Sequence, residues 1–462
     1  MFELDTDLQK GCELHVHVGG CFYVDDIFAM GRDIYEAVDW SLFVESYETA
    51  FGVRPDPVRI FADALTTQPP DLSDLRRHYV FEQQDGGDFG RFMAKFNLLI
   101  SLARHWRQFQ RRDGELVERI VERHRSEGLD YVEYRAMLTN RSAGPDEVVE
   151  FHRSVAQTLK DASGKGLTAR YAVSVPRWDP LGGCELVLRL LEETPELIDT
   201  IVGIDFCNDE EGFPPKTARP VFERLARHNR QNPERALGVL YHVGENFWDK
   251  SLESAVRWCH EAAELGASRL GHAIALGLDP AVAISRREDA HVAELVSERR
   301  DQIQYDLRHQ LELEKFGVEI ATGVLEAEWE ELRGRDPMSG VTRDYSQTRL
   351  EEIRRRQDFV LHRLAESGTV IESCPTSNLR IGGVPDAAHH PIHRFLDSGV
   401  NLVVSADDPG IFDSPLAAEI DWVVAHCKLD AAGLAQRLGR LGNSIVELCM
   451  AQGGASSVLA PV

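Results

Sequence analysis

Two histidines at alternate positions close an apolar run near the start of the chain. The run 13–17 reads ELHVH, with His15 and His17 separated by one residue. Because alternate residues of a β-strand point to the same side of the sheet, both imidazoles can face one site. Imidazole nitrogen is a common ligand of zinc. Taken alone, this motif is equally compatible with a metal site and with two core histidines.

Further polar residues stand at the ends of later apolar runs. They are His242 and Glu245, then His272, then Glu372, and finally Asp407 and Asp408. Chance or core packing accounts for any one of these positions, but it accounts poorly for all of them together. Histidine nitrogen and carboxylate oxygen are both zinc ligands. The pattern therefore predicts one site that several strand ends build jointly.

Such a site requires a fold in which many strand ends meet. Short β-branched or apolar runs alternate with helical patterns, which is typical of βα units around a parallel sheet. This alternation favours an α/β fold, a (β/α)8 TIM barrel, whose catalytic groups lie at the C-terminal ends of the strands. An open doubly wound sheet is the alternative, although no G-x-G-x-x-G turn follows the first run. The eight predicted strands are 13–17, 130–134, 168–174, 200–206, 237–243, 269–272, 370–373 and 401–406.

Two segments are longer than the connections that a minimal barrel needs. We expect both to belong to a single barrel domain spanning residues 1–462. Residues 20–125 form an excursion after the first strand; its aromatic-rich part, 89–99, is predicted to be helical and to cover the barrel mouth. Residues 280–366 form a charged insertion between strands six and seven, with apolar residues at helical spacing. The insertion is interpreted as a solvated helical layer, as a homo-oligomer contact, or as an active-site lid.

Composition limits the function classes. The formal net charge of −25 opposes capture of polymeric nucleic acid, because that binding relies on basic side chains neutralising phosphates. The 8 cysteines include no C-x-x-C pair, which argues against a disulfide framework and fits a reducing compartment. No apolar stretch approaches the length of a membrane span, and the first residues have no signal-peptide pattern. We expect a cytoplasmic protein that acts on a small molecule.

Seven segments, in order along residues 12–420, resemble the motifs of the adenosine deaminase family, which comprises metal-dependent purine deaminases. They are ELHVHVGG, LDYVEYR, VGIDFCNDE, YHVGEN, RLGHAIAL, ESCPTSNL and SADDPGIF. The resemblance implies hydrolytic deamination of an adenine nucleoside, adenosine or deoxyadenosine, to the 6-oxopurine with release of ammonia. It also implies one catalytic Zn2+ per chain, which lowers the pKa of a bound water to about 7. The implied ligands are His15, His17, His242 and Asp407.

The same resemblance implies roles for four further residues. His272 would orient or deprotonate the water, and Glu245 would protonate purine N1 while C6 is attacked. Asp408 would contact the attacking oxygen or the ring. Glu372 would hold a ligand histidine in the required tautomer, although a cap or a structural salt bridge is the alternative for this residue.

Three positions depart from the family pattern. Gly19 stands where adenosine-specific members carry an aspartate that contacts the ribose 5′-hydroxyl, so the site loses a ribose contact and a charge that would repel a phosphate. Asn208 replaces a glycine whose backbone approaches the purine, and asparagine can adopt the same positive φ. Ala273 replaces another glycine. We expect Gly19, Asn208 and Asp408 to contact the substrate.

These departures leave alternatives open. A 5′-substituted adenine nucleoside, or a mononucleotide such as AMP or dAMP, would need a basic partner; the candidates are Arg32, Arg76, Arg77 and Lys95. A two-metal hydrolase would need a bridging residue on strand four, which has no lysine; its Asp205 is expected in a structural turn. The alternative that is not an enzyme is a barrel without catalytic activity that acts in assembly through residues 280–366.

Overall fold

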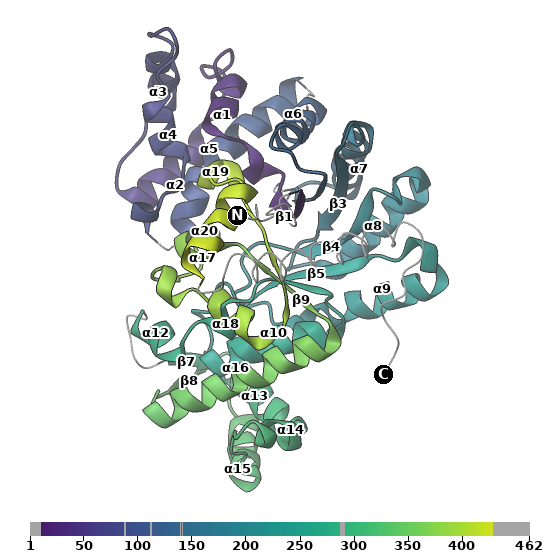
Figure 1. Ribbon diagram of the computed structural model, residues 1–462, viewed down its shortest axis with the longest axis vertical. Helices are drawn as coiled ribbons and strands as arrows, with labels where there is room; N and C mark the ends of the chain where they lie inside the picture. Colours follow the sequence, from purple (N-terminus) through teal and green to yellow (C-terminus); the bar gives the residue numbers. More distant parts are fainter. Residues whose placement is uncertain are drawn as a thin grey trace, which may run out of the picture.

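The computed structural model describes residues 11–86, 89–110, 113–138, 140, 142–286 and 292–427 of the 462-residue chain. Its centre is a sheet of eight parallel strands in the order β1, β2, β3, β4, β5, β6, β9 and β10 (Figure 1). The strands are β1 (Cys12–His17), β2 (Tyr131–Ala136), β3 (Thr168–Ser174), β4 (Ile201–Phe206), β5 (Gly238–Val243), β6 (Arg269–His272), β9 (Val370–Ser373) and β10 (Asn401–Val404).

The first and last strands meet and close the sheet. The backbone N–H of His17 donates to the carbonyl of Asp407 at 2.9 Å, and the N–H of Asp407 donates to the carbonyl of His15 at 2.9 Å. The structure therefore confirms the predicted (β/α)8 barrel and excludes the open doubly wound sheet. The eight predicted strands agree with the observed ones to within two residues at each end.

Burial on both faces explains why the strands read as apolar runs. β2 is buried along its whole length, and β1 is buried except at His17. A barrel strand contacts interior side chains on one face and helices on the other, so apolar residues suit both faces. Three charged residues in these two strands, Glu13, Glu133 and Arg135, are nevertheless buried and therefore require polar partners.

Helices cover the outside of the barrel. The longest, α16, begins after Ser346, whose hydroxyl accepts a hydrogen bond from the N–H of Arg349, and it ends at Gly368 in the left-handed conformation. The helices that follow the barrel strands are α7 (Pro145–Ala162), α8 (Pro180–Glu193), α9 (Arg219–Gln231), α10 (Leu252–Leu265), α11 (Ile274–Gly277), α16 (Gln347–Ser367), α17 (Pro375–Arg380), α18 (Ile392–Ser398), α19 (Pro409–Phe412) and α20 (Leu416–His426).

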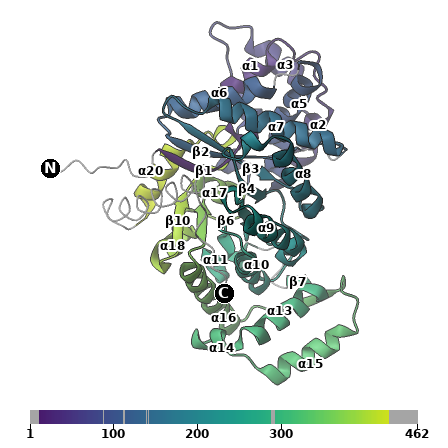
Figure 2. The same ribbon diagram turned by 90° about the vertical axis from the view of Figure 1, so that its right-hand side faces the viewer.

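Six helices between β1 and β2 gather at one end of the molecule in both views (Figures 1 and 2). They are α1 (Val24–Gly31), α2 (Ser41–Phe51), α3 (Pro57–Ala64), α4 (Ser73–Tyr79), α5 (Phe89–His105) and α6 (Asp113–Ser126). Their aromatic residues, Phe43, Phe61 and Tyr79 among them, are buried in the same hydrophobic cluster as the outward-facing residues of the barrel. This shared core joins the excursion to the barrel.

The segment between β6 and β9 contains strands as well as helices. It comprises α12 (Pro280–Ser285), β7 (Val292–Leu295), α13 (Val296–Arg308), α14 (Gln310–Lys315), α15 (Thr322–Arg333) and β8 (Gly340–Arg343) ahead of α16. β7 and β8 pair antiparallel, whereas only helices were predicted here. A four-residue strand is too short to produce a distinct alternation within a charged sequence. α13, α14 and α15 lie at the opposite end of the molecule from α1 (Figure 2).

None of the helices in the described ranges is both long enough and apolar enough to cross a membrane. The expected contact between copies of the chain through residues 280–366 remains a prediction.

The Tyr79 hydroxyl ties the excursion to the loop after β1, because it donates to the carbonyl of Phe22 at 2.6 Å in a fully buried setting. We expect Tyr79→Phe to lower the free energy of unfolding by about 1–3 kcal/mol, since the buried carbonyl loses its donor. Urea unfolding measures this difference. Tyr47→Phe is the control, because that ring is also buried but its hydroxyl has no hydrogen bond within the described residues. Equal effects of the two substitutions would contradict the assignment.

Candidate active site

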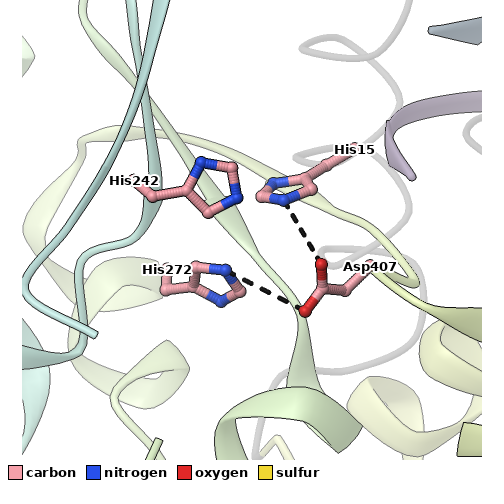
Figure 3. A group of neighbouring side chains, drawn as sticks. All are labelled: His15, His242, His272 and Asp407. Carbon is pink, nitrogen blue, oxygen red and sulfur yellow. Dashed lines mark ion pairs between the residues drawn. The ribbon is translucent and has the colours of Figure 1, made fainter. Parts of the chain in front are cut away.

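A cluster of imidazoles and one carboxylate lies where the barrel strands end. Figure 3 shows His15, His242, His272 and Asp407 pointing toward one another from four different strand ends. These four residues are buried, and each offers a ligand atom within 4.8 Å of the others. Asp407 lies at the centre of the contacts: its Oδ1 is 3.5 Å from His15 Nε2, and its Oδ2 is 4.0 Å from His272 Nε2. The set of donors is one that could hold a metal ion.

His17 lies beside this group and contacts it through the same carboxylate. Its Nε2 is 3.2 Å from Asp407 Oδ1, and its ring centroid is 5.4 Å from that of His15 and 5.3 Å from that of His242. The side chain keeps 18% of its surface exposed and lines the neighbouring cavity. The four predicted ligands therefore come together in space, with His272 next to them.

One arginine binds the two carboxylates that contact His15 and His242. Arg135 is fully buried and contacts Glu372 at 2.5 Å and Asp205 at 3.3 Å. Glu372 Oε2 in turn lies 3.0 Å from His15 Nδ1, and Asp205 Oδ1 lies 3.1 Å from His242 Nδ1. A carboxylate at Nδ1 fixes the ring orientation and leaves Nε2 to face the cluster. Although burial opposes ionisation of both carboxyls, neighbouring positive charge holds the pKa of Glu372 and of Asp205 below its usual range.

The loop after β5 directs Glu245 toward the same space. Glu210 accepts hydrogen bonds from three consecutive backbone N–H groups, those of Gly244 at 3.0 Å, Glu245 at 2.7 Å and Asn246 at 2.8 Å. Gly244 has φ +69°, and a Cβ there would lie 2.7 Å from the sulfur of Cys259. Burial raises the pKa of the Glu245 carboxyl to about 7, so this group can hold a proton near neutral pH.

His272 is oriented by an amide. Its Nδ1 lies 3.0 Å from Oδ1 of Asn378, a residue of α17, which favours a proton on Nδ1 and leaves Nε2 as the basic nitrogen. That Nε2 is 3.6 Å from Glu245 Oε1. His272 and its neighbour Ala273 both have positive φ, +63° and +49°, an uncommon conformation for residues other than glycine.

The carboxyl of Asp408 packs against the backbone of Gly20, where a side chain on residue 20 would clash with it. A Cβ on Gly20 would lie 1.7 Å from Asp408 Oδ1, so any side chain at residue 20 would displace the carboxyl. Burial, together with the charge of Asp407, raises the pKa of Asp408 well above its usual value. The two adjacent aspartates therefore differ in character, since the pKa of Asp407 is lowered by its hydrogen bonds to His15 and His17 despite burial.

The cluster opens into a cavity of about 710 Å³. Gly19 and Asn208 both line it, as does Asp408. A Cβ on Gly19 would lie 2.8 Å from Cζ of Phe96, so a phenyl ring fills the space that a side chain at residue 19 would enter. Asn208 has φ +72°, the conformation that its place in the motif requires.

None of the basic residues that the sequence suggested for a phosphate lines this cavity. Arg76 pairs with Asp413 at 2.7 Å, and Lys95 with Asp85 at 2.8 Å. Arg77 pairs with Asp74, and Arg32 lies 3.5 Å from Asp33. Among the residues of 280–366 that the structure describes, none lines the cavity, so the interpretation of this segment as an active-site lid gains no support.

Sequence reasoning missed the residues that support the site, and it misjudged one. Asp205 was expected in a structural turn, but it is a buried residue of β4 that contacts His242. The carboxyl is needed there because the ring nitrogen of a buried histidine requires a partner. Arg135, Glu210 and Asn378 were not singled out. Each stands inside a recognised motif, and a charged residue within an apolar strand was the available signal for Arg135.

A closed barrel with a histidine and aspartate cluster at its strand ends is an arrangement typical of metal-dependent hydrolases. The sequence profile of one family, adenosine deaminase, matches residues 52–300 and 343–442. The chain belongs to the adenosine deaminase family, as its motifs predicted.

Individual relatives match less of the chain. The adenine deaminase of Rhizobium leguminosarum bv. trifolii is 45% identical over 62 residues, which cover 13% of this chain and only 19% of that protein. Among solved structures, an N6-mAMP deaminase of Arabidopsis superposes with a TM-score of 0.52 at 14% identity, covering 96% of this chain and 97% of the other. An amidohydrolase from Burkholderia ambifaria with bound Zn gives 0.50 at 13% identity, covering 96% and 88%. At these identities, the structural likeness shows a shared fold.

Because Arg135 contacts the carboxylates behind two different histidines, its replacement should disturb both. We expect Arg135→Lys, which keeps the charge but cannot reach both carboxylates, to weaken binding of a divalent transition metal about 10- to 100-fold. Competition with a chelator of known affinity measures the change. Arg356→Lys is a matched control, since Arg356 is a buried arginine paired with Asp306 in the insertion. Unchanged affinity in Arg135→Lys would show that the network does not orient the ligands.

Proposed function

We propose that the chain is a zinc-dependent hydrolase that converts an adenine nucleoside, adenosine or deoxyadenosine, to the 6-oxopurine and ammonia. The observation that carries this proposal is the buried cluster of His15, His242 and Asp407, with the carboxyl of Glu245 next to it at the floor of the cavity. Membership of the adenosine deaminase family and the resemblance to an adenine deaminase support the reaction class.

The residues present fit zinc. The nitrogen His242 Nε2 is buried and has no hydrogen-bond partner within the described residues, which is expected of a ligand atom. The proposed ligands are His15, His17, His242 and Asp407, one ion per chain. Bound zinc would lower the pKa of a water molecule and so supply a nucleophile at neutral pH. The zinc in the amidohydrolase of the same fold supports this choice of metal.

Side chains of the protein accept and donate the protons of the reaction. His272 Nε2 faces the cluster and accepts the proton of the attacking water, while Asn378 holds the ring in the necessary tautomer. Glu245 protonates N1, which lets the water oxygen bond to C6. The amino nitrogen then takes up the proton held by His272, the bond between C6 and this nitrogen breaks, and ammonia leaves. The hydroxyl at C6 returns a proton to Glu245 and becomes the 6-oxo group. Asp408, held over Gly20, hydrogen-bonds the attacking oxygen or the ring.

A 5′-substituted nucleoside or a mononucleotide is the second candidate substrate. The solved N6-mAMP deaminase of the same fold acts on a nucleotide, which favours considering it. However, the four basic residues suggested for a phosphate lie outside the cavity lining and next to carboxylates. No specific observation favours an idle barrel that acts only in assembly.

Removal of one ligand tests the metal assignment. We expect His242→Ala to lose the tightly held zinc and, with it, nearly all turnover of adenosine. Elemental analysis of purified protein gives the metal content per chain. His152→Ala is the control: His152 is a buried histidine, hydrogen-bonded to Tyr171 at 2.6 Å and remote from the cluster, and its removal should leave the zinc in place. Normal zinc content and turnover in His242→Ala would exclude this ligand set.

A second variant tests the proton donor. Glu245→Gln should keep the zinc and lose about 10²- to 10⁴-fold in kcat, the usual contribution of general acid catalysis.

Because the pKa of Glu245 is raised to about 7, kcat/KM of the parent should fall as the pH rises above 7, where the proton is lost. The fall should be absent in the variant. Glu211→Gln alters another carboxyl of the cavity lining and should change kcat far less. Similar losses in both variants would exclude the role.

A further inference from the structure

A second cluster of histidines and carboxylates lies away from the barrel mouth, where the insertion packs on the barrel. His260 and Glu264 are one helical turn apart on α10, and His309 stands between α13 and α14. These three residues each offer a ligand atom, and the three atoms lie within 4.8 Å of one another. α10 belongs to the barrel, whereas α13 and α14 belong to the insertion, so the cluster joins the two parts (Figure 2). The proposed reaction uses none of these groups.

The contacts within this cluster match those of a proposed ligand at the strand ends. His309 Nε2 lies 3.3 Å from Glu264 Oε1, and His309 Nδ1 lies 3.0 Å from Glu312 Oε2. At the barrel mouth, His15 has one carboxylate oxygen 3.5 Å from Nε2 and another 3.0 Å from Nδ1. Bonds of about 2.0–2.2 Å in a tetrahedral zinc site place the ligand atoms about 3.4 Å apart. His309 and Glu264 therefore already have the spacing of two zinc ligands.

The other imidazole, His260, is oriented by a hydroxyl. Its Nδ1 lies 2.8 Å from the Tyr305 hydroxyl, and a proton on Nδ1 leaves the lone pair of Nε2 for a metal. Burial lowers the pKa of His260 to about 4, so the ring is neutral at pH 7. Phe359 of α16 packs beside both imidazoles, with its ring centroid 5.3 Å from that of His260 and 6.1 Å from that of His309. This apolar ring limits the access of water to the cluster.

A positive charge already bridges two of the three groups. Arg308 Nε lies 3.1 Å from His309 Nε2, and Arg308 Nη2 lies 3.2 Å from Glu264 Oε2. Because 55% of the Arg308 side chain is exposed, the guanidinium can move into water at little cost when a metal ion takes its place. Although burial lowers it, hydrogen bonds to Glu264 and Glu312 raise the pKa of His309, so the ion also displaces a proton there.

We propose that His260, Glu264 and His309 form a second zinc site, which fastens the insertion to the barrel. Two imidazoles and one carboxylate are a ligand set of zinc, and water completes its four-coordinate shell. The ion connects α10 with the turn between α13 and α14, so its binding free energy stabilises the contact between the two parts. The partly exposed Glu264 gives an ion access from solvent. This inference does not depend on the proposed reaction.

Titration of the full chain with Zn2+, after its first site has been filled, tests the proposal. Equilibrium dialysis with elemental analysis should show a second ion per chain, and the midpoint temperature of thermal unfolding should rise as this ion binds. A chain that holds only the first ion in excess zinc overturns the inference, and the deaminase assignment stands. His242→Ala should lose the first ion and keep the second, which separates a failure of the proposed function from a failure of this inference.

Substitutions locate the second ion. His309→Ala should weaken its binding by more than about 10- to 100-fold, the usual cost of losing only a residue that supports a ligand. Glu264→Gln, at a partly exposed position, should have the same effect without a change in the core. His362→Ala is the matched control: His362 Nε2 lies 3.3 Å from Glu366 Oε1, but this pair belongs to no group of three metal ligands within the described residues.

A third variant tests the place of the ion. Arg308→Ala removes the cation that bridges Glu264 and His309, so it should tighten binding of the second ion several-fold. No increase in affinity would contradict the position assigned to the ion. A second ion that binds as tightly to His309→Ala and Glu264→Gln as to His362→Ala would lie elsewhere and would refute the site.

Discussion

The buried contact of Arg135 with Glu372 and Asp205 is the interaction on which the site depends. These three side chains carry charge in the interior of the barrel, where an unpaired ion is very costly, so each is stable only with the others present. The same contacts place a carboxylate at Nδ1 of His15 and of His242. A charge network therefore replaces apolar packing at the centre of the barrel, and the orientation of two imidazoles follows from it.

Barrel closure and site assembly are one event. Asp407 pairs through its backbone with β1 and through its carboxyl with the histidines of β1, so the hydrogen bonds that close the sheet also bring the carboxylate to its place. The neighbouring loops follow the same rule, since Glu210 organises the turn that carries Glu245 and Asn378 orients His272. Each reactive group thus depends on a residue from a different βα unit, which is characteristic of this architecture.

The sequence predicted the strands and the residues at their ends because both leave local signals: an apolar run, followed by a histidine or a carboxylate. It did not predict Arg135 as a partner of Glu372, because those residues are 237 positions apart and only the closed barrel brings them together. The β7–β8 pair was not predicted, because a strand of four residues shows too little alternation of apolar and polar residues to be recognised. The contribution of α6 and α7 to the cavity wall was not predicted, since apolar residues in an amphipathic helix look the same whether they face a core or a cavity.

The left-handed residues at the strand ends have a consequence for the dynamics of the protein. Asn208, His272, Ala273 and Asp407 all have φ between +49° and +72°, and such conformations in residues with a Cβ carry strain that the surrounding structure must hold. Relief of this strain favours local opening at the edge of the barrel where the strands end. In amide hydrogen exchange, the C-terminal ends of the barrel strands would be the first part of the sheet to exchange. A ligand that contacts several of these strand ends would slow exchange on all of those strands.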